Sequence, residues 1–160
     1  MQKNILYIII GIVVLVIIGF VGMRFVPGLN GVQQNLNGTQ TYSNNEGSVT
    51  VGTNAGMPSG WPNDLPSNYT GAHIIYSGNS NPQTGQAGAA ISYTLQDASA
   101  QTVASYYQNG LTEKGWSIES NANMGGQIVI GAKKDGKTFA AIIIDSGDGT
   151  VTVTAGLGLE

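Results

Sequence analysis

The sequence predicts an α+β protein, in which a single transmembrane helix is followed by a two-layer domain made of an antiparallel sheet with one helix on a face. Three observations lead to this fold class. Residues 5–23 form an uninterrupted apolar run, residues 100–111 carry apolar side chains at helical spacing, and several short segments around that helix alternate between apolar and polar residues. Such alternation is typical of half-buried strands. The predicted order of the domain is β-β-α-β-β-β.

The apolar run at residues 5–23 is predicted to cross a lipid bilayer. Its 19 residues would cover roughly 28 Å as a helix, close to the hydrocarbon thickness of about 30 Å. A cleaved signal peptide has a shorter apolar core, of about 7 to 15 residues, and a small-residue cleavage site, which does not follow this run. We therefore expect an uncleaved signal anchor.

The charges beside this run predict its orientation. The N-terminal amine and Lys3 on one side outnumber Arg24 on the other side, and positive charge favours the cytoplasmic side. We therefore expect a single-pass protein of the cell membrane, with the N-terminus in the cytoplasm and the domain outside. The expected partner of residues 5–23 is the lipid bilayer.

Composition divides the chain into an anchor at 1–26, an Asn-rich flexible tether at 27–58 and an extracytoplasmic α+β domain at 59–160. The tether contains one charge, Glu46, and too few apolar residues to bury a core. Within it, only residues 48–53 alternate in a way that could form a short edge strand. The remaining length, about 100 residues, suits a single domain with one core.

The strands of the domain are predicted from alternation and from β-branched residues. The segments are 72–77, 89–95, 127–133, 137–145 and 150–155, with a weaker one at 117–121. Asp135 and Gly136 form a two-residue hairpin signal between two of them. Residues 137–145 are apolar on both faces, as in a central strand covered on both sides or covered partly by a neighbour.

The predicted helix has one apolar stripe and recognisable ends. The stripe consists of Ala100, Val103, Ala104, Tyr107 and Leu111. Asp97 or Ser99 can cap the first turn by accepting from its exposed amides. After the last turn, Gly115 can take the left-handed conformation, which in a Schellman end places Trp116 against Leu111.

Composition also excludes several functions. Cysteine is absent, which excludes disulfides, thiolate catalysis, cysteine-ligated zinc and a lipid-modified cysteine. The formal net charge is −3, and a chain without a basic face is a poor binder of nucleic acid. Lys133, Lys134 and Lys137 do cluster, but they flank the predicted hairpin turn and are interpreted as its solvated tip. No cofactor is expected.

No catalytic or metal-binding constellation is evident, and no site residue is predicted. His73 is the one histidine, and no G-x-S-x-G elbow accompanies it. The stretch from Asp145 to Gly149 resembles a calcium loop only in composition, so a hairpin turn is the better interpretation. Asn37 and Asn68 begin triplets of the N-glycosylation pattern, which arise readily by chance in a chain rich in Asn and Thr.

Three stretches carry a resemblance to known proteins. They are WPNDLPSNYTGAHIIYSG from Trp61, SYYQNGLTEKGWSIE from Ser105 and GAKKDGKT from Gly131. Together they resemble a group of small bacterial envelope proteins with one membrane or lipid anchor, a polar tether and a β-β-α-β-β-β domain. The resemblance covers residues 61–156. It implies a fold and a location, and it transfers no functional residue.

The sequence leaves more than one class of function open. The first is a non-enzymatic surface module that binds another protein, a wall polymer or copies of itself. The second is an envelope enzyme or enzyme accessory with its site on the loops at 78–88 or 124–126. The third is a surface filament subunit, although the processing site of a prepilin is absent. An exposed aromatic patch with Trp61, Tyr69 or Tyr106 would favour binding, whereas a cleft that joins His73 to a carboxylate would favour an enzyme.

Overall fold

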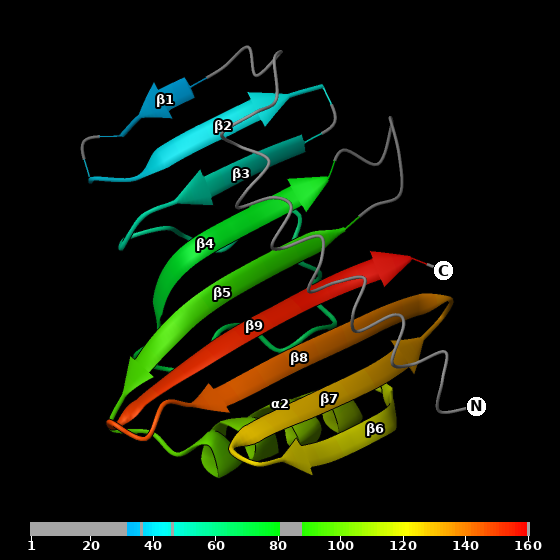
Figure 1. The fold of residues 1–160 in the computed structure, drawn as a ribbon. Coiled ribbons are helices and arrows are strands. Elements are labelled where there is room, and N and C mark those ends of the chain that lie inside the picture. The colour runs from blue at the N-terminus through cyan, green and yellow to red at the C-terminus, as the bar shows by residue number, and fades with distance from the viewer. Residues whose placement is uncertain (1–31, 36, 46, 81–87, 160) are drawn as a thin grey trace.

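The computed structural model describes residues 32–35, 37–45, 47–80 and 88–159. Its elements are β1 (Val32–Gln34), β2 (Gln40–Asn44), β3 (Gly47–Val51), β4 (His73–Ser80), β5 (Ala89–Gln96), α2 (Ala100–Glu113), β6 (Ser117–Met124), β7 (Gln127–Lys134), β8 (Lys137–Asp145) and β9 (Thr150–Leu159). The nine strands of these residues form one antiparallel sheet in the order β1-β2-β3-β4-β5-β9-β8-β7-β6, and α2 is the one helix that the described residues contain (Figure 1).

The chain builds this sheet as two meanders that meet in its middle. β1 to β5 follow one another across one half of the sheet, and β6 to β9 follow one another back across the other half. α2 connects the two meanders, because it follows β5 in the middle of the sheet and leads to β6 at the far edge. β9 then pairs with both β5 and β8, so that the two meanders become one sheet.

Side chains alternate between two faces of the sheet. We name the face that α2 covers the helix face, and the opposite one the open face. In Figure 1, α2 lies behind β6, β7 and β8, and it contacts all three strands. On β8, Phe139, Ala141 and Ile143 lie on the helix face within the main core, whereas Ala140 and Ile142 alternate with them on the open face. β8 is thus a central strand that is apolar on both faces, as its sequence predicts.

The ends of α2 confirm the predicted caps. At the first turn, the Ser99 side chain accepts a hydrogen bond from the backbone N–H of Thr102 at 3.1 Å, so Ser99 is the N-cap. At the last turn, Gly115 has a φ of +79°. The N–H of Trp116 donates to the carbonyl of Leu111 at 2.9 Å, which is the bond that defines a Schellman end. This end turns the chain so that Trp116 is buried beneath the helix it follows.

The loop between β3 and β4, at 52–72, covers the rest of the helix face. Ala55 and Leu65 of this loop are buried in the same core as the inner side of α2. Asp64 fixes the loop to the other half of the sheet, since its backbone carbonyl accepts a hydrogen bond from the Trp116 indole at 2.6 Å and its carboxylate lies 3.3 Å from the Lys134 ammonium. Helix and loop therefore form one continuous layer.

The number of strands in the predicted fold class is wrong. Instead of a β-β-α-β-β-β domain, the described residues contain five strands before the helix and four after it. The strands predicted around the helix are present, and the weak one at 117–121 is the full-length β6. β1, β2 and β3 lie within 27–58, where the sequence predicts a flexible tether. The segment at 48–53, predicted as an edge strand, contains most of β3, which pairs on both sides.

The first part of that fold class, a transmembrane helix, is corrected as well. The apolar run at 5–23 lies outside the described residues. In the part of the chain that the structure describes, no helix combines the length and the apolar character that crossing a bilayer requires. The predicted class is therefore replaced by a nine-stranded antiparallel sheet with one helix on a face.

Gly115→Ala is expected to lower the free energy of unfolding by about 1 kcal/mol, because alanine is strained at a positive φ. A Cβ at this position would meet no atom within 4 Å, so the loss comes from the backbone alone. Gly56→Ala is the matched control, since a Cβ there also meets nothing within 4 Å and the residue is not at positive φ. Urea denaturation followed by tryptophan fluorescence measures both variants. Equal stability of the two variants would contradict the cap.

Candidate functional site

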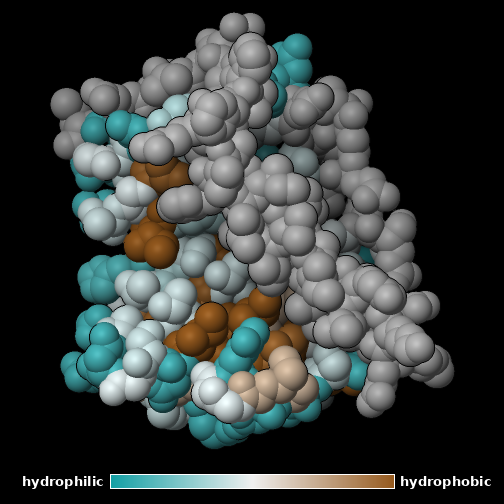
Figure 2. Space-filling view, in the orientation of Figure 1, coloured by the Kyte–Doolittle hydropathy of each residue, from teal (hydrophilic) through white to brown (hydrophobic). Residues whose placement is uncertain are grey.

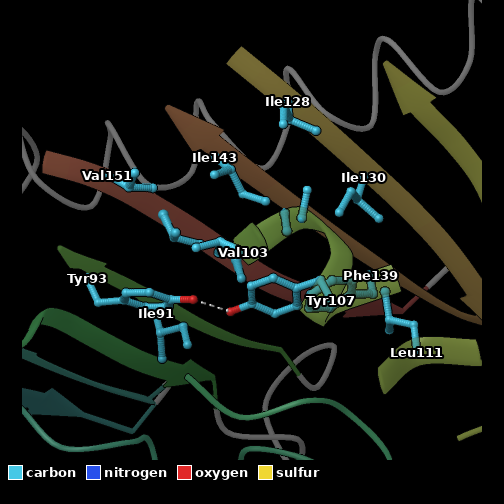
Figure 3. Packing of buried hydrophobic residues seen from close by; sticks show 14 of the residues in the cluster. Ile91, Tyr93, Val103, Tyr107, Leu111, Ile128, Ile130, Phe139, Ile143 and Val151 are labelled. Carbon is cyan, nitrogen blue, oxygen red and sulfur yellow. Dashed lines mark hydrogen bonds between the residues drawn. The ribbon is translucent and has the colours of Figure 1, made fainter. Parts of the chain in front are cut away.

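The space between α2 and the sheet is filled by aromatic and aliphatic side chains (Figure 3). The ring of Phe139 on β8 lies with its centroid 5.8 Å from that of Tyr107 on α2 and 6.3 Å from that of Trp116. The largest side chains that are fully buried are Tyr93, Tyr107, Phe139, Ile91, Leu95, Leu111, Ile130, Ile143, Val103, Val151 and Val153. This interface is therefore a packed core.

Two tyrosine hydroxyls meet within this core. The hydroxyls of Tyr93 on β5 and Tyr107 on α2 share a hydrogen bond of 3.0 Å (Figure 3), and the backbone N–H of Tyr69 donates to the Tyr93 hydroxyl at 3.4 Å. Burial raises the pKa of Tyr93 to about 12 and raises the pKa of Tyr107 well above 10. Both phenols therefore stay neutral near pH 7. A general acid or base works best with a pKa near the operating pH, so this pair serves to join sheet, helix and loop.

Beyond the area that α2 covers, the helix face changes from apolar to polar. Ser48 and Thr50 of β3 lie opposite Asn79 and Ser77 of β4, and all four are on this face. The loop residues 56–59 pass over them. Together they enclose a recess of about 190 Å³, which we name the polar recess. Its lining consists of Ser48, Thr50, Gly56, Met57, Pro58, Ser59, Ser77 and Asn79.

The polar recess is lined by neutral hydrogen-bonding groups. The Ser48 hydroxyl donates to the side-chain oxygen of Asn79 at 2.8 Å, which leaves the Asn79 amide nitrogen as a donor. The hydroxyls of Thr50 and Thr41 share a hydrogen bond of 2.9 Å. Ser77 is buried, and Thr50 and Asn79 are half-buried. None of the eight lining residues is ionisable, so the recess attracts neither cations nor anions through a full charge.

Backbone contacts hold the loop above the recess. The N–H of Ala55 donates to the carbonyl of Ile74 at 3.1 Å, and the N–H of Gly52 donates to the carbonyl of Ile75 at 3.0 Å. Both acceptors belong to the stretch where β4 shifts register against β5. Gly52 has a φ of +132°, and a Cβ there would approach the carbonyl oxygen of Gly38 to 2.9 Å. The position therefore requires glycine, and the start of the loop is fixed.

The three aromatic residues considered in the sequence as a possible exposed binding patch instead cover the edge of the core. Trp61, Tyr69 and Tyr106 are all half-buried and pack against the core cluster. The Trp61 indole donates to the carbonyl of Pro66 at 3.0 Å, and the rings of Tyr69 and Tyr106 meet edge to face at 5.2 Å. The interpretation of Trp61 as a residue of the core rim is confirmed.

The structure does not bring His73 together with a catalytic partner among the described residues. His73 is exposed at the start of β4, opposite Thr94 of β5. Across the described ranges, no group of three or more His, Asp or Glu side chains is placed to hold a metal ion. The Asp148 carboxylate accepts from the backbone N–H of Thr150 at 2.9 Å, and this bond lowers the pKa of Asp148. Asp148 thus stabilises the β8–β9 turn, as the hairpin interpretation predicts.

In the part of the chain that the structure describes, the two loops considered for an enzyme site contain no histidine, acidic or basic residue. Of residues 78–88, the first three belong to β4, and 81–87 are not among the described residues. Residues 124–126 form the β6–β7 turn, with Gly125 and Gly126 at φ +61° and +95°. Such angles are what a tight hairpin turn requires.

The lysine cluster lies beside a second hairpin turn, between β7 and β8. Asp135 and Gly136 have φ values of 48° and 72°, as a two-residue turn requires. Lys134 and Lys137 lie 3.3 Å and 3.9 Å from the Asp64 carboxylate. The position of the cluster at a hairpin turn is confirmed, but the lysines are half-buried and two of them face a loop carboxylate, so the tip is less solvated than the sequence predicts.

Sequence reasoning missed the residues of the polar recess. The signal that was available is the alternation at 48–53, where Ser48 and Thr50 lie on one side and Val49 and Val51 on the other. It indicates a strand but not a site, because the recess exists only once β3 pairs with β4 and the loop folds back over both.

The fold defines an α+β protein in which one antiparallel sheet holds a single helix on one of its faces. The chain belongs to the START domain-like family, whose model matches residues 76–156, just over half of the chain. The matched residues run from β4 to β9 and include α2. Comparisons with curated proteins and with solved structures gave no match. β3 and the loop over the recess lie outside the matched residues.

The free energy of unfolding is expected to fall between about pH 10 and pH 12. Tyr93 has a pKa of about 12 in the folded chain and about 10 when unfolded, so in this window the unfolded state alone releases the proton, which favours unfolding. Below pH 10 both states hold the proton, and this contribution is constant. Tyr93→Phe should reduce the decline by up to about 1.4 kcal/mol for each pH unit.

Denaturant titrations at several pH values measure this decline. Tyr42→Phe, at a half-buried position of β2, is the matched control and should keep the decline of the unchanged chain. A Tyr93→Phe variant that loses stability with pH as steeply as this control would show that the buried phenol pair does not titrate as described.

Proposed function

We propose that this chain is a non-enzymatic binding module and that its polar recess takes a small, neutral group rich in hydroxyls, such as a single sugar ring. The observation that supports this proposal is the lining of the recess by four hydroxyl-bearing residues and one amide without any charge. Hydroxyl groups both donate and accept hydrogen bonds, and an amide offers two donors and an acceptor. These are the partners that sugar hydroxyls require.

The size of the recess limits the ligand. Sites for drug-sized molecules have volumes of about 300 to 1,000 Å³, whereas the polar recess has about 190 Å³. It therefore suits one ring or one side chain of a larger molecule. Met57 and Pro58 add apolar surface above the hydroxyl groups, and a sugar ring presents both kinds of surface.

The chemistry of the lining favours binding over catalysis. A serine or threonine hydroxyl becomes a useful nucleophile when an adjacent base accepts its proton. The lining contains hydroxyls of Ser48, Thr50, Ser59 and Ser77 but neither a histidine nor a carboxylate. Because the hydroxyls lack such a base, they are suited to hold a ligand in place.

Nuclear magnetic resonance of the full chain tests this proposal. Titration with glucose and with N-acetylglucosamine should cause saturable shifts of the backbone amides of Ser48, Thr50, Ser77 and Asn79. Glucose 6-phosphate is the charged comparison and should bind more weakly, because no cation lines the recess. Asn79→Ala removes a side chain that offers donors and should weaken binding by about 2- to 10-fold, the usual range for one hydrogen bond.

Ser43→Ala is the matched control. Ser43 of β2 lies directly opposite Ser48 in the ladder but is exposed and does not line the recess. This variant should bind as the unchanged chain does. If neither neutral sugar shifts the recess amides at millimolar concentration, or if both variants respond alike, the recess is not the binding site.

A further inference from the structure

An Asn-Gly pair lies exposed in the turn between β1 and β2. It consists of Asn37 and Gly38, both exposed, and Gly38 has a φ of +80°. The N–H of Gly38 donates to the carbonyl of Asn35 at 3.1 Å, and the N–H of Asn35 donates to the carbonyl of Thr39 at 2.9 Å, so the turn is closed by its backbone. The turn lies at the left edge of Figure 1, and Figure 2 shows hydrophilic residues at this edge. Water therefore reaches the peptide bond of the pair.

Two donors from one residue hold the side-chain oxygen of Asn37. The hydroxyl of Thr39 donates to the Oδ1 of Asn37 at 2.7 Å, and the backbone N–H of Thr39 donates to the same oxygen at 3.3 Å. The hydroxyl also accepts a hydrogen bond from the side-chain amide of Asn35 at 2.8 Å. Because the amide occupies one acceptor site of this hydroxyl, the hydroxyl proton is kept in the direction of Asn37.

Such a pair of donors stabilises negative charge on the oxygen that it holds. When a nucleophile adds to a carboxamide carbon, the carbonyl oxygen becomes an oxyanion, and donors that are already in place lower the barrier. The backbone nitrogen of Gly38 is the nucleophile nearest in the chain, since its addition to the Cγ of Asn37 closes a five-membered ring. Glycine has no side chain to hinder this approach, and a Cβ on Gly38 would meet no atom within 4 Å.

We propose that Asn37 is a site of spontaneous deamidation and that Thr39 promotes the reaction by stabilising the oxyanion. The Gly38 nitrogen loses its proton to water and forms a bond to the Cγ of Asn37. The Cγ–Nδ2 bond then breaks, and Nδ2 takes up a proton and leaves as ammonia. Water opens the resulting cyclic imide at one of its two carbonyls, which gives either aspartate or isoaspartate. No group is oxidised or reduced, and water is the one co-reactant.

The modification changes the contact between this turn and the loop at 52–72. The side-chain amide of Asn37 donates to the carbonyl of Asn54 at 3.5 Å, and the side-chain amide of Asn54 donates to the carbonyl of Asn37 at 3.2 Å. Deamidation removes the first of these donors. Isoaspartate also lengthens the backbone by one carbon before Gly38, whose carbonyl oxygen would lie 2.9 Å from a Cβ on Gly52. The start of the loop is therefore the part of the fold that the modification affects.

The chain contains a second Asn-Gly pair that serves as a comparison. Asn109 is exposed, and it lies with Gly110 inside α2. Helical side chains are tilted toward the N-terminus of their helix, so the carboxamide of Asn109 is directed away from the nitrogen of the next residue. That nitrogen also lies in the helical ladder, where an N–H donates to the carbonyl four residues earlier. Asn109 thus has the same neighbour as Asn37 in a geometry that opposes ring closure.

Incubation of the full chain at mildly alkaline pH, followed by peptide mass spectrometry, tests the proposal. Fragment spectra assign the replacement of an amide by a carboxyl group to one residue. Asn37 should be converted about 10-fold or more faster than Asn109, the effect of one hydrogen bond to a charged group. In urea, where the fold is lost, the two residues should react at similar rates. This comparison uses the unchanged chain, and it does not depend on what the polar recess binds.

Thr39→Val tests the role of the hydroxyl, because valine keeps the branched shape and removes the donor. It should slow the conversion of Asn37 by about 10-fold and leave that of Asn109 unchanged. Thr39→Ser is the matched control, since it retains the hydroxyl, and it should react as the unchanged chain does. Equal conversion of Asn37 and Asn109 in the folded chain would overturn the proposal, as would equal conversion of Asn37 in the valine and serine variants.

Discussion

The width of the sheet is the constraint on which the rest of the structure depends. Nine strands at a spacing of about 4.8 Å make a sheet roughly 38 Å wide, whereas a helix of 14 residues is only about 21 Å long. One helix cannot cover such a face. α2 covers the half with β6, β7 and β8, and the core beneath it continues under the loop at 52–72, which adds Ala55 and Leu65.

The remaining half of the helix face is covered by a loop, and this difference produces the candidate site. A helix forms its backbone hydrogen bonds internally and presents a continuous apolar stripe. A loop, in contrast, has backbone groups and short side chains that need hydrogen-bond partners. The strands beneath it accordingly carry Ser48, Thr50, Ser77 and Asn79 in place of apolar residues. Because Gly52 and Ala55 fix the loop to β4 by backbone hydrogen bonds, it stands over the strands as a rigid cover and leaves a recess between them.

The elements that could be predicted from the sequence are those with strong local signals. The stripe of α2, its glycine at Gly115 and the turn at Asp135 and Gly136 are determined by neighbouring residues, and all are present. β2 was not predictable in this way, because its polar sequence forms a strand only through pairing with β3, and β3 in turn pairs with β4. The recess joins Ser48 to Asn79 from strands that are adjacent only in the folded sheet.

Hydrogen exchange of the β3 backbone amides tests the central claim that one continuous sheet extends from β4 through β3. The amides of Gly47–Val51 should exchange slowly, since β3 pairs with a strand on each side, and they should be protected together with those of β4. Exchange of these amides at the rate of an unfolded peptide, while β4 and β5 remain protected, would contradict the nine-stranded sheet and with it the polar recess.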